Sequence, residues 1–167
     1  MKVNQFGGQE KLKRAYEIAL TGNYLIKIFA PELTQEQINE YIQPIKECIA
    51  DNDETPHLLI ELQKPDFFDL VSRRKCETLE DVKKRAKEKR LNNDKPEIDI
   101  SDASETLLKT AYERLNLMPH EIGIILNVAA TIAQMDNSKK IDLQHVAEAI
   151  QYRSIDPELK NKQQCME

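Results

Sequence analysis

The segment from Arg73 to Arg90 contains the densest group of side chains that could bind an anion. It holds nine Lys or Arg residues against four Asp or Glu residues. Guanidinium and ammonium groups bind phosphates and nucleic-acid backbones, but no aromatic residue interleaves the run for base stacking. A solvated helix face is therefore the preferred interpretation, and an anionic partner is the alternative. The residues of this candidate patch are Arg73, Arg74, Lys83, Lys84, Arg85, Lys87 and Arg90.

The histidines and cysteines do not form a pattern typical of a metal or catalytic site. The three histidines are His57, His120 and His145, and none has a His or Cys three or four residues further on. The three cysteines are Cys48, Cys76 and Cys165, which are far apart and form no CxxC pair. We predict no catalytic residue, no metal site and no disulfide framework.

Composition favours a helical protein with a charged surface. Hydrophobic residues make up 40% of the chain and charged residues 32%, and Trp does not occur. The net charge of -5 argues against a general nucleic-acid binder, which is usually basic over its whole domain. No apolar run approaches the roughly 18 residues that span a bilayer, and residues 1–14 lack the apolar core of a secretory signal. We therefore expect a cytoplasmic protein that does not enter membranes.

The first half of the chain predicts a β-α-β unit. Residues 9–20 have apolar residues at helical spacing, and residues 24–29 and 57–62 are short β-branched or apolar runs typical of buried strands. Thr34 and Gln37 form a capping-box pattern, which predicts that a helix starts there, with a break conceivable at Pro44. Strand, helix and strand in this order predict a parallel crossover.

The second half predicts helices. The basic segment is expected to form a helix capped at Thr78, residues 91–99 read as a linker, and Asp102 and Asp142 are predicted caps of later helices. Residues 119–135 are apolar on two faces, which predicts a surrounded helix. The predicted domains are a β-α-β unit with its basic helix at 1–92, a helical bundle at 100–155 and a flexible tail at 156–167.

The segment AYERLNLMPHEIGIILNVAATIAQMDNSKKIDLQHVAEAIQYRS resembles the helical lid of bacterial magnesium-chelatase-like AAA+ ATPases, the competence-related branch of the magnesium chelatase family. The resemblance depends on Thr131 to Ala133, a short polar turn, and Ala147 to Arg153. GGQEKLKRAYEIALTGNYLIKIFAP, TQEQINEYIQPI and LLIELQKPDFFDL are similar to parts of the family's nucleotide-binding domain. The resemblance implies an AAA+ fold that is shortened, and a family that binds ATP and Mg²⁺.

The residues that would bind phosphate in this family are replaced. A phosphate loop needs glycines whose N–H groups surround the phosphates, a Lys for the outer phosphates and a Ser or Thr for Mg²⁺. The resemblance places Glu32 and Thr34 at glycine positions and Gln35 at the Lys position, after Pro31. The family also has a strand that ends in paired acids for Mg²⁺. This chain has no such strand in its sequence, because the middle of the family's domain is missing.

The nucleotide-facing arginines of the lid are replaced as well. The resemblance places His120 at the first of these positions and Ile124, Asn127 and Ala130 at the later ones. An apolar face at helical spacing must be covered, so Ile124 and Ala130 are candidates for a protein interface. Two strands alone also leave two open sheet edges. We therefore expect a homodimer or another protein partner.

These interpretations predict a mainly α protein with a small two-stranded parallel β-α-β unit and a lid-like helical bundle. The expected function is that of a non-catalytic, degenerate member of the family that binds other proteins, with no cofactor. Two alternatives stay open: a nucleotide-binding subunit that acts with an intact AAA+ ATPase, and a DNA-associated accessory protein that uses the basic segment.

Overall fold

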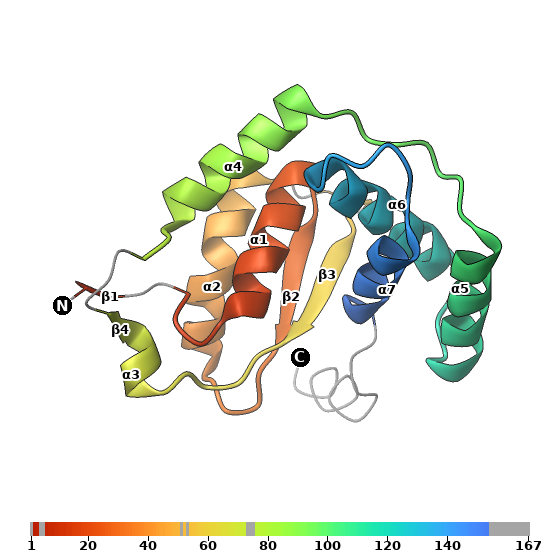
Figure 1. Cartoon of the computed structure of the whole chain (residues 1–167). Coiled ribbons are helices and arrows are strands. Elements are labelled where there is room, and N and C mark those ends of the chain that lie inside the picture. The colour runs from red at the N-terminus through yellow and green to blue at the C-terminus, as the bar shows by residue number, and fades with distance from the viewer. Residues whose placement is uncertain (1, 4–5, 51, 53, 73–75, 154–167) are drawn as a thin grey trace. The chain divides into compact units, whose positions relative to one another are not determined.

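A computed structural model describes residues 2–3, 6–50, 52, 54–72 and 76–153 (Figure 1). The chain divides into two compact units, Met1–Lys87 and Glu88–Glu167. Helix α4 (Leu79–Asn92) begins in the first unit and ends in the second.

The first unit is built around two parallel strands. Strands β2 (Leu25–Phe29) and β3 (His57–Glu61) pair from Leu25 opposite His57 to Phe29 opposite Glu61. Helix α2 (Gln35–Cys48) connects them, as parallel strands require a long crossover. Four of the five β2 residues and the central three of β3 are buried, because apolar side chains alternate to both faces of a strand. The predicted two-stranded parallel sheet is confirmed.

Helices α1 (Glu10–Gly22) and α2 pack against this sheet. Helix α1 buries the apolar stripe expected from its spacing, and Asn23 ends it in the left-handed conformation at φ 65°. The predicted capping box of α2 is present, since Thr34 Oγ1 accepts from the Gln37 N–H and Gln37 Oε1 accepts from the Thr34 N–H. The helix continues through Pro44, so the conceivable break there does not occur.

Three short elements of this unit carried no clear sequence signal. They are β1 (Lys2–Val3), α3 (Phe67–Leu70) and β4 (Val71–Ser72), and β1 pairs with β4 in an antiparallel ladder. The chain next to this ladder is very close to another segment at Gly7, where an added Cβ would lie 1.7 Å from the Asp69 carbonyl oxygen. Only glycine fits there. Two-residue strands are too short for periodicity to predict.

The second unit is helical. After the last turn of α4 it contains α5 (Asp102–Arg114), α6 (Pro119–Met135) and α7 (Leu143–Gln151). The predicted bounds of α6 are confirmed, and Pro119 occupies its first turn, where a missing N–H costs nothing. The predicted cap of α5 was wrong by one residue, because Ser101, not Asp102, accepts from the Ser104 N–H. The expected linker also begins later, since α4 continues to Asn92.

Helix α6 is the centre of this unit, and its two ends differ. Every residue from Val128 to Met135 is buried, whereas Ile122, Ile124 and Leu126 are half-buried. The expectation of a helix surrounded along its length therefore holds for its second half. Gln134 and Asn93 exchange two hydrogen bonds, each side-chain amide donating to the other's carbonyl oxygen at 2.9 and 2.8 Å. These bonds attach the segment after α4 to α6.

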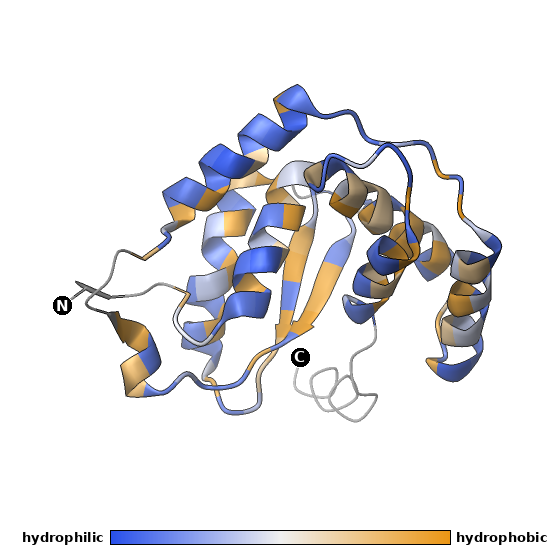
Figure 2. Ribbon diagram, viewed as in Figure 1, coloured by the Kyte–Doolittle hydropathy of each residue, from blue (hydrophilic) through white to orange (hydrophobic). Residues whose placement is uncertain are grey.

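The architecture is mainly helical with a two-stranded parallel sheet, as the sequence predicted. Figure 2 shows both strands as largely hydrophobic and α4 as hydrophilic along most of its length. In the part of the chain that the structure describes, no helix is long and apolar enough to cross a membrane.

His145 is a buried capping residue in the second unit. Its Nδ1 accepts from the Asp142 N–H at 3.0 Å, and its Nε2 lies 3.1 Å from Asp136 Oδ2. Because Nδ1 accepts, Nε2 carries the proton and donates to Asp136. The imidazole is 1% exposed. Its two hydrogen bonds connect Asp136, at the end of α6, to the first turn of α7.

We predict that His145→Ala lowers the free energy of unfolding by about 2 kcal/mol, because it removes both hydrogen bonds and leaves a cavity. Urea denaturation followed by circular dichroism measures this. His120→Ala is the matched control, since His120 is exposed on α6, and it should change stability by less than about 0.5 kcal/mol. Equal effects of the two substitutions would contradict the structural role of His145.

Candidate functional site

The junction between β2 and α2 is the position for which the sequence resemblance predicts a phosphate site with replaced residues. The chain turns after β2 with the Leu33 N–H donating to the Ala30 carbonyl. Pro31 and Glu32 in this turn are exposed. Thr34 Oγ1 takes one of the free N–H groups at the start of α2, and the Gln35 amide donates to Asn39 Oδ1 at 3.1 Å. The junction therefore offers an anion a carboxylate and an amide, and no ammonium group.

The four predicted lid positions are all on α6, in the second unit. His120 and Asn127 are exposed, Ile124 is half-buried and Ala130 is 0% exposed. Of the two predicted interface residues, only Ile124 presents accessible surface, because the Ala130 side chain is already covered in the chain. None of the four is a Lys or Arg.

A buried ion pair lies at the same end of the second unit. Arg153 Nη2 is 3.6 Å from Glu121 Oε1, and the two side chains are 9% and 12% exposed. Burial lowers the pKa of the Arg153 guanidinium, and the Glu121 carboxylate opposes that shift. The guanidinium is bound to this carboxylate and is not presented to solvent. Sequence reasoning placed no interaction at this pair, because residues 121 and 153 are distant along the chain.

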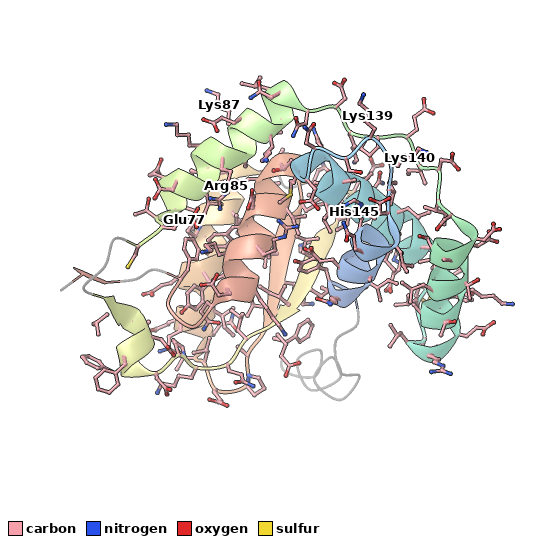
Figure 3. The ribbon with its side chains drawn as sticks, in the orientation of Figure 1. Glu77, Arg85, Lys87, Lys139, Lys140 and His145 are labelled. Carbon is pink, nitrogen blue, oxygen red and sulfur yellow. The ribbon has the colours of Figure 1, made fainter. Side chains whose placement is uncertain are left out.

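Helix α4 carries the predicted basic patch, but its cations have different surroundings. Arg85 donates from Nε to Glu17 Oε1 at 3.0 Å and from Nη1 to Glu77 Oε1. Lys83 lies 3.4 Å from Glu80. Lys84, Lys87 and Arg90 are exposed, and Figure 3 marks Lys87 together with Arg85 and Glu77. Arg73 and Arg74 lie outside the described residues.

The Arg85 contacts form a small ion network that attaches α4 to α1. Glu77 also accepts from Lys13 Nζ at 3.1 Å, and Lys13 pairs with Glu10 at 3.2 Å. The hydrogen bond from Arg85 holds the pKa of the Glu77 carboxyl below its ordinary value. Val82 and Ala86 on the same helix are buried. Arg85 is thus a structural residue, which its position in a basic run did not indicate.

Three cavities lie in the described part of the chain at places where the sequence predicted no site. One of about 610 Å³ lies before α7 and is lined by Lys139 and Lys140 together with Glu97, Asp99 and Asp142 (Figure 3). Its two cations are outnumbered by three carboxylates, so it has no excess positive charge with which to select an anion. A second of about 470 Å³ lies at the start of α1 beside Gln9, whose amide donates to the Gln63 carbonyl at 2.8 Å. The third is an apolar groove between α5 and α6.

The remaining candidates for chemistry are dispersed. Cys48 is exposed and Cys76 half-buried, both as free thiols, and Cys165 lies outside the described residues. Among the residues whose placement is described, no group of three or more His, Cys, Asp or Glu side chains could hold a metal ion.

A small β-α-β unit and a helical bundle define the class: a mainly helical protein with a two-stranded parallel sheet and a lid-like helical domain. Residues 71–153 match the family described as magnesium chelatase, subunit ChlI C-terminal. By this match, residues 71–153 are a magnesium chelatase C-terminal domain, which makes up slightly less than half of the chain. No curated protein and no solved structure shows a significant match. The match leaves residues 7–70 outside it, so their resemblance to the nucleotide-binding domain stays a prediction.

We predict that the Glu77 network makes stability depend on pH. A carboxyl whose pKa is lower in the folded chain stabilises it above its unfolded pKa of about 4.3, and this contribution disappears as the pH falls. Glu77→Gln should therefore cost up to about 1 kcal/mol at pH 7 and progressively less toward pH 3. Thermal unfolding across this pH range measures the effect.

Glu80→Gln is the control for this measurement, because the Glu80 side chain is 82% exposed and pairs only with its helix neighbour Lys83 among the described ion pairs. It should leave the pH profile of stability almost unchanged. A Glu77→Gln profile parallel to that of the unmodified protein would refute the contribution of the network.

Proposed function

We propose that this chain is a non-catalytic member of the magnesium chelatase family that acts by binding other proteins. The observation that carries the proposal is the chemistry of the junction between β2 and α2. Phosphate binding at a helix start uses free backbone N–H groups and a nearby cation. Here Pro31 has no N–H, Thr34 occupies an N–H of α2, and Glu32 adds a negative charge.

Magnesium and ATP, the groups expected of the family, do not fit the residues of this junction. Gln35 stands at the position that resembles the phosphate-binding Lys, and its amide is hydrogen-bonded to Asn39. An amide cannot neutralise developing negative charge as an ammonium group does. Glu32 and Glu36 are exposed on either side, and like charges at close range are repulsive. These features support a protein that does not hydrolyse ATP.

The lid supports the same proposal. The positions that resemble nucleotide-facing arginines hold His120, Ile124, Asn127 and Ala130, and Arg153 is paired with Glu121. Apolar side chains cannot neutralise the charged phosphates of a nucleoside triphosphate, but the core of a protein interface buries such side chains. The half-buried Ile124 remains a predicted interface residue.

We predict no phosphate release from ATP and no thermal stabilisation by Mg-ATP. A ligand that binds the folded chain at 100 times its dissociation constant would stabilise it by about 2.7 kcal/mol, a shift of several degrees in Tm. Malachite-green detection of phosphate and differential scanning fluorimetry measure both quantities. Clear phosphate release would overturn the proposal. Stabilisation without release, abolished by Gln35→Ala, would instead favour a nucleotide-binding subunit that works with an intact ATPase.

The second candidate function, DNA association, is favoured by one observation: Lys84, Lys87 and Arg90 are exposed on α4. Three phosphate contacts would give a logarithmic salt slope of about -2.7 on duplex DNA. We expect no such binding near physiological salt, because the chain carries a net charge of -5. Fluorescence anisotropy with labelled DNA tests this.

The matched variants for the DNA measurement are Lys84→Ala/Lys87→Ala/Arg90→Ala and Lys139→Ala/Lys140→Ala, the latter removing exposed cations from a different turn. Salt-sensitive binding that the first variant removes and the second retains would establish the DNA function instead.

A further inference from the structure

Each strand of the two-stranded parallel sheet in the first unit has one edge without a neighbouring strand (Figure 1). The edge of a strand presents backbone N–H and C=O groups that can pair with a strand of another chain. Helices α1 and α2 both pack against β2, whereas the helix contacts of β3 in the described chain come chiefly from α1. The outer edge of β3 is therefore the more open of the two.

The hydrogen bonds of the sheet show which residues of β3 face its outer edge. The Leu62 N–H donates to the Phe29 carbonyl at 3.0 Å, so the even-numbered residues of this segment direct their backbone groups toward β2. Since successive residues of a strand direct these groups to alternate sides, His57, Leu59 and Glu61 direct theirs away from β2. The outward N–H and C=O groups of Leu59 and Glu61 make no hydrogen bond with another described residue.

The outer edge of β2 is already partly occupied. The Tyr24 N–H, at the start of the strand, donates to the Ala19 carbonyl at 3.0 Å. The Ala30 carbonyl, at the other end, accepts from the Leu33 N–H at 3.1 Å. An added strand would therefore meet backbone groups that are bonded within the chain at both ends of β2, which again favours the edge of β3.

The side chains of β3 are self-complementary in charge for antiparallel pairing. His57 and Glu61 lie two residues before and two residues after Leu59, and both side chains are exposed. When a second β3 pairs antiparallel about a two-fold axis at Leu59, His57 of each copy lies opposite Glu61 of the other. A carboxylate opposite an imidazole is a favourable cross-strand pair, whereas parallel pairing in register would place Glu61 beside Glu61, which is repulsive.

We propose that two copies of this chain pair along the outer edge of β3, in an antiparallel ladder centred on Leu59. Each opposed pair then exchanges two N–H···O bonds, because both of its residues direct their backbone groups to the edge. The ladder joins the two sheets into one continuous sheet and has the two-fold symmetry of most homodimers. The inference rests on the proposed role in protein binding and deepens it, since it names a second copy as the partner and β3 as the surface.

The contact is short, so the dimer is weak. Five paired residues span about 17 Å, and one such ladder buries less than the roughly 800 Å² per partner of a standard interface. Sedimentation equilibrium of the full chain from about 10 μM to about 1 mM covers the range in which weak contacts become populated. The unmodified protein should form dimers within this range.

Charge variants of β3 test the pairing. His57→Glu places two carboxylates opposite each other in both pairs, and Glu61→Lys removes the carboxylate from both, so each should raise the dissociation constant about tenfold. His57→Lys keeps a cation opposite Glu61 and should keep the dimer. The matched controls are His120→Glu and Glu47→Lys, which make the same charge changes at exposed positions on α6 and α2 and should leave the dissociation constant unchanged.

Mixing His57→Glu with Glu61→Lys tests the antiparallel register. In the mixed dimer each carboxylate of the first variant lies opposite a basic side chain of the second, so both pairs are complementary again. The mixture should associate about tenfold more tightly than either variant alone. The double variant His57→Glu/Glu61→Lys should dimerise by itself, because it exchanges the two charges within one strand. Circular dichroism and thermal unfolding check that every variant is folded, as expected for substitutions at exposed side chains.

Three results would overturn the inference: a monomer throughout the concentration range, a dimer that the β3 variants weaken no more than their controls, or a mixture no tighter than its components. Phosphate release measured on the same samples separates the two proposals. A monomer that releases no phosphate contradicts only the β3 dimer, whereas a dimer with the expected response that hydrolyses ATP contradicts only the non-catalytic role.

Discussion

The parallel pairing of β2 with β3 is the constraint on which the first unit depends. Parallel strands cannot be joined by a tight turn, so α2 must run the length of the sheet between them. Both strands bury side chains on both faces of the sheet. Two strands alone cannot shield these side chains from water, so helices must pack against the sheet. The packing of α1 and α2 on the strands, and the attachment of α4 to α1 through Arg85 and Glu17, follow from that need.

The same constraint bears on function. In α/β proteins, ligands bind beyond the carboxyl ends of parallel strands, where a loop leads into a helix. The end of β2 in this chain has that strand-to-helix arrangement, and the sequence resemblance predicts that Glu32 and Gln35 stand there at positions of glycine and lysine. The fold itself depends on burial and capping, so this arrangement forms whatever the chemistry of the residues at the junction.

The second unit depends on a different balance. Helix α6 is buried along its second half and half-exposed along its first, so its apolar surface is only partly covered. The apolar groove lies at this less covered end, beside Pro119 and Ile122. Buried polar groups near α6 are paired within the unit: Gln134 with Asn93, and Arg153 with Glu121. The exposed side chains of the unit are mostly polar or charged, and the groove adds an apolar surface among them.

The sequence by itself determined the elements whose signals are local. The capping box at Thr34, the periodicity of residues 119–135 and the two short apolar runs each depend on neighbours a few positions away, and all of these elements formed. The replacement of phosphate-binding residue types, which the sequence resemblance implies, stays a prediction. Only the tertiary structure decided which charged side chains form ion pairs and which apolar side chains are exposed to solvent. Arg85 became part of an ion network and Ala130 became buried, whereas Phe67 and Phe68 stayed exposed. Those outcomes depend on contacts between residues distant in sequence, which no local pattern encodes.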